Sequence, residues 1–498
     1  MSYMGLDVGT TGCKAVAFDA RGRQLASASR EYATLSPREG WAELDSEHVA
    51  ESCLAVIREA AAACPGDPVR GLGISSQGEA FTPVGPNGEM LANAMVSSDS
   101  RAAGIADSWS HQFGREKLYA LTGHTAHPMF SLFKLLWLRD NQPDVWRAAA
   151  HFYCFEELIQ HRLGLEPAIS WPLAGRTMLF DVRRHQWAPE ILDAVGLEPS
   201  RLARPLASGT VVGTIPHAVA QELGLPDGVV VVTGGHDQPC SALGAGVTEP
   251  GRAAYGTGTV ECICPAFPAP VFSEDLCRSN LCTYDFTLEG MYTTVAFSLT
   301  GGNLLKWFRD EWGQQEVAEA EQAGVSPYEV LLRQMAPQPT KLLVLPYFTP
   351  TGTPYFDTEA TGAILGLRLT TSRGEVLRAL LEGVALEMRL NLDILARSGM
   401  AVNQLLATGG GAKSRVWTQL KADVLNTPIT TVAVTEAGCL GVAMLACAAH
   451  TGASVKELVG EWVRMGQVLE PNPVHAAYYA ERFERYVQLY PTLRTLKV

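Results

Sequence analysis

The feature that most constrains this chain is a turn rich in glycine and threonine, set between two apolar runs, that occurs twice. The first copy lies in Met4–Phe18, where the runs 4–8 and 15–18 flank a turn at 9–12. The second lies in 251–264, around Tyr255-Gly-Thr-Gly-Thr259. Apolar runs joined by such turns predict β-hairpins with exposed tips. Two similar hairpins, each opening one half of the chain, indicate an internal repeat.

The first hairpin carries groups that suit phosphate. Backbone N–H groups of the turn, the Thr10 and Thr11 hydroxyls and the Lys14 ammonium are donors for phosphoryl oxygens. Asp7 offers an acceptor for a magnesium shell. Short turns of this composition are common, so an ordinary hairpin in which Asp7 ends a strand explains the pattern equally well.

Length and composition limit the architecture and the partners. A chain of 498 residues predicts two large domains, which we place at 1–247 and 248–498. Its 47% hydrophobic and 18% charged residues are typical of a globular protein. A net charge of -13 disfavours nucleic acid as a partner, because binding a phosphate backbone needs concentrated Lys and Arg.

The cysteines and apolar segments bear on the compartment. The 11 cysteines are scattered and form no CxxC pair, which favours reduced thiols. The acidic Asp7 so near the start argues against a signal peptide. The apolar centre of the longest uncharged run, Cys439–Ala449, is too short to span a bilayer. We therefore expect a cytoplasmic protein with no membrane partner.

Strand and helix patterns alternate along the chain and predict an α/β fold. Asp45 or Ser46 is the expected N-cap of the first helix. The expected strands are 24–29, 71–75, 228–233 and 404–406, and the expected helices are 46–63, 129–141, 240–246 and 416–425.

Polar side chains follow the strand at 71–75. Gln77 and Glu79 come directly after it, and Asp99 and Arg101 follow in the next segment. Open α/β sheets usually bind ligands beyond the carboxyl ends of their strands. The alternative is that these are solvated loop residues, or that an Asp99–Arg101 ion pair merely pins the chain.

Two further motifs follow strands. Asp237 comes after Gly234-Gly235-His236 and is a general-base candidate, although Asp is also a favoured N-cap. Gly409–Gly411 precede a helix, where a nucleotide phosphate would be favoured, although a plain glycine-rich turn also fits. His124 and His127 lack a Cys or Glu cluster, so we expect a surface loop with two histidines rather than a metal site.

Taken in order, these motifs resemble the FGGY family of carbohydrate kinases, within the actin, hexokinase and heat-shock-protein ATPase superfamily. Asp7–Lys14 resembles the first phosphate motif of the family and Tyr255–Thr259 the second. Met129–Asn141 and Gly362–Glu382 resemble its two long signatures. The resemblance covers essentially the whole chain. It implies two actin-like, ribonuclease H-like α/β domains with a catalytic cleft between them.

The resemblance also implies residue roles. Asp237 would be the catalytic base, and Asp7 would belong to the magnesium shell, through water. The sugar would be faced by Gln77, Glu79, Asp99 and Asp237, and ATP by Gly9, Thr10, Thr11, Lys14, Gly256, Thr257, Gly258, Gly409, Gly410 and Lys413. The implied cofactors are ATP and Mg²⁺, and the implied partners are a small sugar and a second copy in a homodimer.

The acceptor is less constrained. Gly78-Glu79 stands where xylulose kinases usually show Met-His and glycerol kinases Arg-Glu, and Ser97 stands where many members have Trp. We expect these departures to remove bulk from one wall of the sugar pocket and to add a carboxylate. Gly235–Gln238 resembles deoxyketose kinases such as fuculose kinase. A ketopentose such as xylulose is the expected substrate.

Three alternatives remain open. The first is another ketose or polyol, of the fuculose, ribulose or glycerol type. The second is a non-sugar ATPase of the same fold that uses the cleft as a conformational switch. The third is a kinase-derived binding protein.

Overall fold

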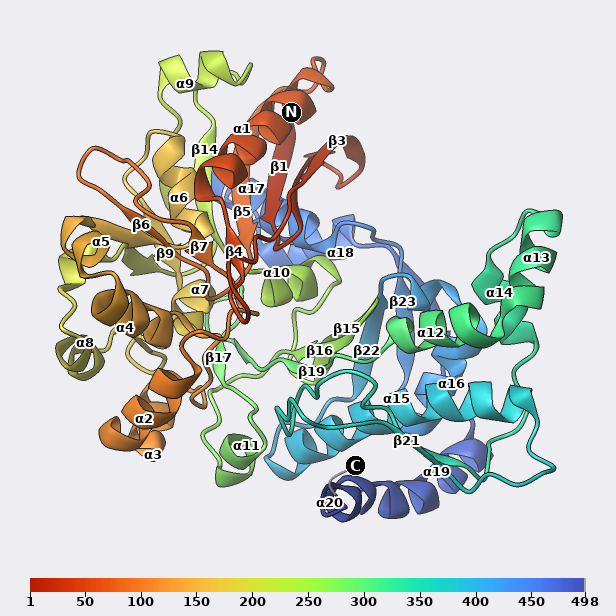
Figure 1. The fold of residues 1–498 in the computed structure, drawn as a ribbon. Helices are drawn as coiled ribbons and strands as arrows, with labels where there is room; N and C mark the ends of the chain where they lie inside the picture. The colour runs from red at the N-terminus through yellow and green to blue at the C-terminus, as the bar shows by residue number, and fades with distance from the viewer. Residues whose placement is uncertain (497–498) are drawn as a thin grey trace.

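The computed structural model describes residues 1–496, which form two lobes, each built around a six-stranded sheet (Figure 1). The first lobe surrounds the sheet β13 (Val211–Thr214), β14 (Val230–His236), β5 (Val69–Ser76), β1 (Ser2–Val8), β2 (Gly12–Asp19) and β3 (Gln24–Glu31), in that order. The second lobe surrounds the sheet β19 (Ala296–Ser298), β16 (Glu261–Pro265), β15 (Arg252–Thr257), β22 (Gln404–Thr408), β23 (Ile429–Val432) and β24 (Met465–Leu469).

The two sheets share one topology. In the first, β1, β2 and β3 form an antiparallel meander, β5 and β14 continue parallel to β1, and β13 closes the edge antiparallel. In the second, β15, β16 and β19 form the meander, β22 and β23 run parallel to β15, and β24 closes the edge. The predicted hairpins, the internal repeat and the two-lobed α/β fold are confirmed.

Helices and short ribbons complete the lobes. Helices of the first half are α1 (Ser46–Ala62), α2 (Ala103–Phe113), α3 (Arg115–Thr122), α4 (Ser131–Asn141), α5 (Pro143–Ala148), α6 (Phe155–Arg162), α7 (Trp171–Arg176), α8 (Pro189–Val195), α9 (His217–Glu222) and α10 (Asp237–Gly244). Those of the second half are α11 (Glu274–Arg278), α12 (Gly302–Trp312), α13 (Gln314–Ala323), α14 (Pro327–Arg333), α15 (Arg373–Arg397), α16 (Arg415–Leu425), α17 (Ala437–Thr451), α18 (Val455–Trp462), α19 (Pro473–Tyr486) and α20 (Leu489–Arg494). The ribbons pair β4 (Glu43–Leu44) with β7 (Ala94–Met95), β6 (Thr82–Val84) with β8 (His151–Tyr153), β9 (Ala168–Ser170) with β12 (Arg204–Leu206), β10 (Phe180–Asp181) with β11 (Gln186–Trp187), β17 (Tyr284–Asp285) with β18 (Tyr292–Thr293), and β20 (Leu343–Leu345) with β21 (Ala363–Leu365).

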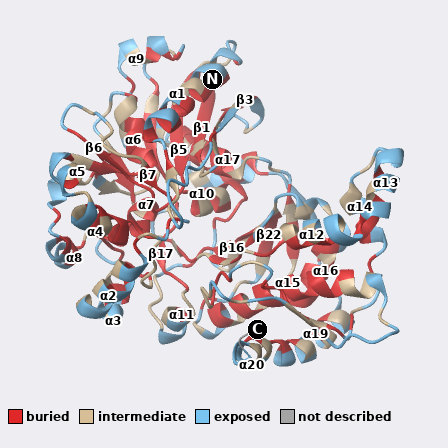
Figure 2. Cartoon of the chain, viewed as in Figure 1, coloured by how far each residue is buried: buried red, intermediate tan, exposed pale blue. Residues whose placement is uncertain are grey.

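Helix α17 comes late in the chain but packs on the first sheet, where it lies beside β1 and β5 (Figure 1). Its backbone comes so close that a Cβ at Gly5 would meet Cys439 O at 1.9 Å and one at Gly73 would meet Val442 O at 2.3 Å. With α10 it forms a buried cluster that reaches strands of both sheets, from Val232 to Leu406 (Figure 2). The proposed boundary at 248 therefore divides the sequence but not the packing of α17.

The predicted elements agree with the structure except near their ends. Asp45 caps α1 by accepting a hydrogen bond from His48 N at 3.1 Å. Strand β14 continues through Gly234 to His236, and α10 begins at Asp237 rather than at Cys240. Among residues 1–496, no helix is long and apolar enough to cross a lipid bilayer.

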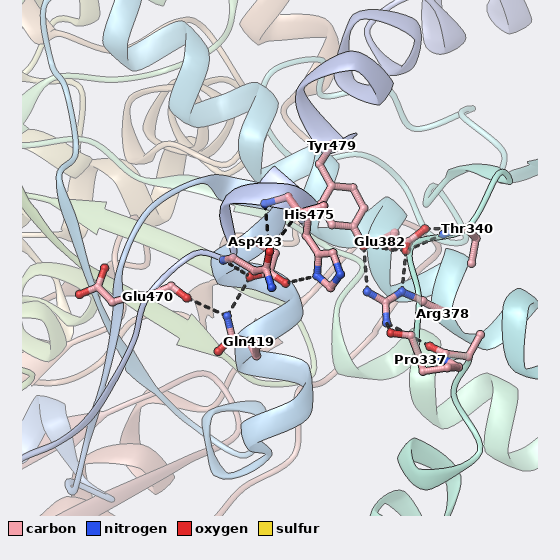
Figure 3. Close-up of polar contacts among 12 residues, drawn as sticks. Pro337, Thr340, Arg378, Glu382, Gln419, Asp423, Glu470, His475 and Tyr479 are labelled. Atoms are coloured by element: carbon pink, nitrogen blue, oxygen red, sulfur yellow. Dashed lines mark hydrogen bonds and ion pairs between the residues drawn. The ribbon is translucent and has the colours of Figure 1, made fainter. Parts of the chain in front are cut away.

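A polar network fixes the C-terminal helices onto the second lobe (Figure 3). Glu382 on α15 accepts hydrogen bonds from Arg378 Nε at 2.8 Å and from the Tyr479 hydroxyl of α19 at 2.7 Å. On α16, Asp423 Oδ2 lies 2.8 Å from His475 Nδ1 of α19. Because Glu382 is buried, these hydrogen bonds offset the cost of removing its carboxylate from water. Helix α19 thereby holds α15 and α16 in place beneath the second sheet.

Candidate active site

The second lobe contains a cavity of about 420 Å³ at the tip of its hairpin. Ligand pockets are commonly of this size. Its walls comprise Thr257, Gly258, Thr259, Gly302, Asn303, Leu305, Lys306, Tyr328, Leu332, Gly410, Gly411, Ser414 and Trp417. Backbone-rich loops on one side and aromatic and aliphatic side chains on the other suit a nucleotide, with phosphates near the loops and the base near the apolar wall.

The two glycine-rich loops of this cavity are locked together. Gly409 has φ +89°, and a Cβ there would meet Thr257 O at 2.8 Å, so only glycine fits. Thr257 is buried, and its hydroxyl donates to Thr408 O at 2.7 Å. Thr257 therefore holds the loops in register and does not offer that hydroxyl to a ligand. Gly410 lines the cavity and has open space around it, whereas Lys413 is exposed and lies outside the lining.

The tip of the first hairpin is held from behind by Gln77. Gln77 Nε2 donates to Gly9 O at 2.9 Å, and the Thr10 hydroxyl donates to Gln77 Oε1 at 3.3 Å. The Gly9 N–H closes the turn by donating to Gly12 O at 2.9 Å. Within the turn, the N–H groups of Thr10 and Thr11 have no hydrogen-bond partner among residues 1–496. Gln77 thus supports the phosphate loop, in addition to any contact with sugar.

Lys14 is already paired in this structure. Its Nζ lies 2.7 Å from Glu436 Oε1, just before α17, and both side chains are about one-third exposed. A phosphate would have to compete with Glu436 for this ammonium. The predicted phosphate contact of Lys14 stays a prediction.

Asp237 stands where β14 ends and α10 begins, on the first lobe. The N-cap of α10 is His236, and Asp237 is the first helical residue, so the alternative interpretation of Asp237 as the cap is wrong. Its Oδ1 is buried and lies 3.2 Å from His236 Nε2, while the side chain as a whole is 31% exposed. The second hairpin comes close to it, because Cys262 Sγ of β16 donates to Gln238 Oε1 at 3.2 Å.

The electrostatics of Asp237 suit a proton acceptor. Burial, followed by the charges of Asp7 and Glu79, raises its pKa to about 7, against a lowering effect of Arg176. A base with a pKa near the working pH combines availability with driving force for proton transfer. Perturbed carboxylates of this kind cluster at functional sites.

Asp7 lies on strand β1, which β5 separates from β14 in the sheet. Its Oδ1 accepts a hydrogen bond from the Ser75 hydroxyl at 2.6 Å, and burial raises its pKa. Among residues 1–496 there is no group of three or more His, Cys, Asp or Glu side chains that could hold a metal ion. Any cation here would therefore need most of its ligands from water and from a bound phosphate.

The comparisons with known proteins bear directly on this geometry. The models of the N-terminal and C-terminal domains of the FGGY family of carbohydrate kinases match residues 2–244 and 253–450. The chain belongs to this family. A carbohydrate kinase of this family uses ATP, which fits the cavity of the second lobe.

Individual relatives of this FGGY kinase cover nearly its whole length. It is 24% identical to the xylulose kinase of Bacillus subtilis, over 100% of this chain and 98% of that protein. It is 29% identical to the autoinducer-2 kinase of Salmonella typhimurium, over 99% and 94%. The crystal structure of the xylulose kinase from Rhodospirillum rubrum superposes with a TM-score of 0.90 at 27% identity, over 100% of both chains. The actin-like fold expected from the sequence is confirmed.

Glu79 of this FGGY kinase faces Arg176 of α7. Arg176 Nε donates to Glu79 Oε1 at 2.6 Å, and Nη2 contacts the same oxygen. Glu79 has a left-handed backbone, with φ 66°. Its carbonyl accepts hydrogen bonds from Ser131 Oγ at 2.8 Å and from Lys134 Nζ at 3.4 Å. The signature helix α4 therefore stabilises a conformation that is costly for a side chain other than glycine.

The space beside Gly78 is filled, contrary to the expectation of an emptier wall. A Cβ on Gly78 would lie 3.0 Å from His236 Cδ2 and 3.4 Å from Arg176 Cβ. The bulk that other members place on residue 78 is replaced here by side chains from β14 and α7. The added carboxylate of Glu79 is likewise offset by the Arg176 guanidinium.

Asp99 is fully engaged within the protein. Its two oxygens accept hydrogen bonds from Arg101 Nε at 2.9 Å, and Oδ2 also accepts one from Ala42 N at 2.7 Å. Arg101 stacks 3.7 Å above the Trp41 ring. The ion pair considered from the sequence is present, and a sugar contact of Asp99 stays a prediction.

Several residues of the site were not found from the sequence. Arg176, Tyr284 and Ser75 carry no local signal, whereas His236 adjoins Asp237 in a motif that was noted. The prediction that His124 lies on a surface loop is wrong, because this histidine is completely buried against Tyr284. Its Nδ1 lies 2.7 Å from Thr122 O, and burial lowers its pKa to about 3.

Proposed function

We propose that this FGGY kinase transfers the γ-phosphoryl group of ATP to a hydroxyl of a ketose, with a ketopentose such as xylulose as the first candidate. The observation that carries the proposal is the partly exposed Asp237 carboxylate, whose pKa is raised to about 7, beside the hairpin strand β16 of the other lobe. Asp237 accepts the proton of the sugar hydroxyl while the oxygen of that hydroxyl attacks the γ-phosphorus. The bond between this phosphorus and the ADP oxygen breaks at the same step.

The two hairpins would hold the phosphates from opposite lobes. The unpartnered N–H groups of Thr10 and Thr11 are donors for the β- and γ-phosphates. The turn at Gly256–Gly258 would face the same phosphates from the other lobe, with its Gly258 N–H bonded to Val260 O at 3.1 Å in this structure. Gly409 and Gly410 would face the α-phosphate and nucleoside, with Lys413 at the margin. Lobe closure would bring these groups together and exclude water that could otherwise accept the phosphoryl group.

Asp7 fits a magnesium ion held through water. Mg²⁺ in kinases is bound by one or two carboxylates together with substrate phosphates, and Asp7 is a partly buried carboxylate beside the hairpin tip. The ion would offset charge on the phosphates. Asp237 would remain free for the proton.

The substrate assignment rests on the relatives and on the site. Relatives named xylulose kinase cover the whole chain at about a quarter identity, and Gln77 and Glu79 lie just past the end of β5. The relative named autoinducer-2 kinase, at 29% identity, favours a second candidate, a kinase of autoinducer-2. The space beside Gly78 is filled by His236 and Arg176, and Glu79 is paired with Arg176. This site is therefore not simply an enlarged xylulose pocket.

The decisive experiment is Asp237→Asn, with sugar-dependent ADP formation, ATP affinity and melting temperature as readouts. Loss of a general base typically lowers the rate by about 10² to 10⁴, so we expect ATP binding and folding to persist while kcat is nearly lost. The matched control is Asp227→Asn, because Asp227 is an exposed carboxylate that faces only His217 in a surface ion pair. Retained kcat in Asp237→Asn would sink the proposal.

A screen of ketoses and polyols separates the remaining alternatives. A kinase shows ADP release that depends on the acceptor, whereas a conformational ATPase releases ADP without one.

We also propose a cytoplasmic location, supported by 11 free cysteines in the described chain, and a homodimer, which sedimentation would test.

A further inference from the structure

His236 is positioned to orient the proposed base, beside Gln238, whose side-chain hydrogen bond lowers the pKa of Asp237. Asp237 Oδ1 is buried without a well-aligned hydrogen-bond partner among residues 1–496, and His236 Nε2 lies 3.2 Å from it. Catalytic hydrogen bonds are often poorly aligned before substrate binds and improve in the complex. A small rotation of either side chain would satisfy both groups.

Tyr284 favours the tautomer of His236 that carries its proton on Nε2. The Tyr284 hydroxyl lies 2.9 Å from His236 Nδ1. Burial raises the pKa of Tyr284 well above its usual value and lowers that of His236 well below, so the phenol is protonated and the imidazole neutral. A neutral imidazole that accepts at Nδ1 carries its proton on Nε2, the nitrogen that faces Asp237.

The sequence around His236 is unusual for a purely structural residue. His236 is the N-cap of α10, yet its side chain makes no capping hydrogen bond. Asn, Asp, Ser or Thr at this position would stabilise the helix better. The ring also packs tightly against Gly78, since a Cβ there would lie 3.1 Å from Nε2.

We propose that His236 is a positioning residue for phosphoryl transfer. Its Nε2–H holds Oδ1 of Asp237 so that Oδ2 faces the acceptor hydroxyl, and Tyr284 holds His236 in the required tautomer. This inference rests on the proposed role of Asp237 as the base. It also means that the base on the first lobe is oriented by β17, a strand from the second half of the chain.

Other charged and titratable groups face this pair, and all of them except Tyr284 stay unchanged in every variant of the test. Around Asp237 they are Asp7 of β1, Glu79 after β5, Arg176 of α7, Cys240 of α10, Cys262 and Cys264 of β16, and Tyr284 of β17; His236 is also faced by Arg176 and His124.

The test compares three variants through the pH dependence of kcat/KM for the best ketose. His236→Met removes the donor but keeps bulk, so kcat should fall about ten- to a hundredfold, with ATP affinity unchanged. A carboxylate that loses a donor has a higher pKa, so the acid limb should move to higher pH. His236→Gln, which can return an amide donor, should recover much of kcat. Tyr284→Phe should also move the acid limb of the kcat/KM profile to higher pH, by a smaller amount than His236→Met.

The control variant is Tyr292→Phe on the paired strand β18. Its hydroxyl lies 3.4 Å from a different histidine, His185, so the pH profile should match that of the wild type. The inference would be overturned if the acid limb of the pH profile in both His236→Met and Tyr284→Phe matched that of the wild type. It would also be overturned if kcat of His236→Gln were as low as that of His236→Met. If His236→Met does not fold, Tyr284→Phe decides alone, because it keeps the ring.

A second readout separates this inference from the proposed function. Carbon-13 NMR of labelled aspartate follows the titration of Asp237 in the full chain without substrate, with Asp237→Asn assigning the signal. We expect a higher pKa in His236→Met and Tyr284→Phe than in the wild type. Such a shift in a protein without sugar kinase activity would uphold the pairing and reject the function. No shift in an active kinase would reject only the pairing.

Discussion

The pair formed by Glu79 and Arg176 leads to a prediction with a defined magnitude. Their side chains are only 4% and 9% exposed, and removing one partner of a buried ion pair costs about 3 to 5 kcal/mol. Glu79→Gln keeps an acceptor oxygen, so we expect the low end, about 3 kcal/mol. For a lobe of about 250 residues each kcal/mol lowers Tm by roughly 2 to 4 °C, which predicts a fall of roughly 6 to 12 °C.

The double variant Glu79→Gln/Arg176→Gln identifies the cause. If Glu79 chiefly neutralises Arg176, removing both charges should restore most of the lost Tm, and the interaction energy between the two substitutions should be at least about 1 kcal/mol. Differential scanning calorimetry gives Tm, and kcat/KM for a series of deoxyketoses reports on substrate contacts. An unchanged Tm in Glu79→Gln, together with a raised sugar KM, would refute this reasoning and show that Glu79 serves the substrate.

Three further predictions concern the hairpins and the base. Thr257→Val removes the hydrogen bond to Thr408 O, so the dissociation constant of ATP should rise about tenfold; calorimetric titration showing unchanged affinity would remove this contact from the nucleotide site. With the pKa of Asp237 raised to about 7, its carboxylate becomes ionised as pH rises, so kcat/KM should fall about tenfold per unit below that pH, and a flat profile from pH 5.5 to 7 would contradict it. If Lys14 binds phosphate in competition with Glu436, Glu436→Gln should lower the KM for ATP and Lys14→Met should raise it, whereas equal and small effects would mark the pair as structural.

The sequence was sufficient where structure is determined locally. Apolar runs around a Gly/Thr turn define the hairpins, and Asp45 in front of an amphipathic run defines the start of α1. The order of motifs then indicated the family by resemblance, and with it the actin-like fold and the proposed role of Asp237. The hairpins and the start of α1 need only the period of the pattern and the conformational preferences of glycine and capping residues.

The sequence was insufficient where partners come from distant segments. Arg176 lies 97 residues from Glu79, and Tyr284 lies 48 residues from His236, and neither distance leaves a local pattern. The same limit explains the error at Gly78. A glycine shows that a side chain is absent, but only the three-dimensional structure shows that His236 and Arg176 fill the space.

Helix α17 has a consequence for biosynthesis. Residues 437–451 are made last among the parts of the first lobe, and Gly5 and Gly73 leave its sheet shaped to receive that helix. Until residues 437–451 have left the ribosome, the apolar surface of β1 and β5 lacks its cover. A fragment ending near residue 247 should therefore bind chaperones or aggregate, although it contains a complete sheet. The nascent first lobe can complete its packing only after almost 200 residues of the second lobe have also been synthesised.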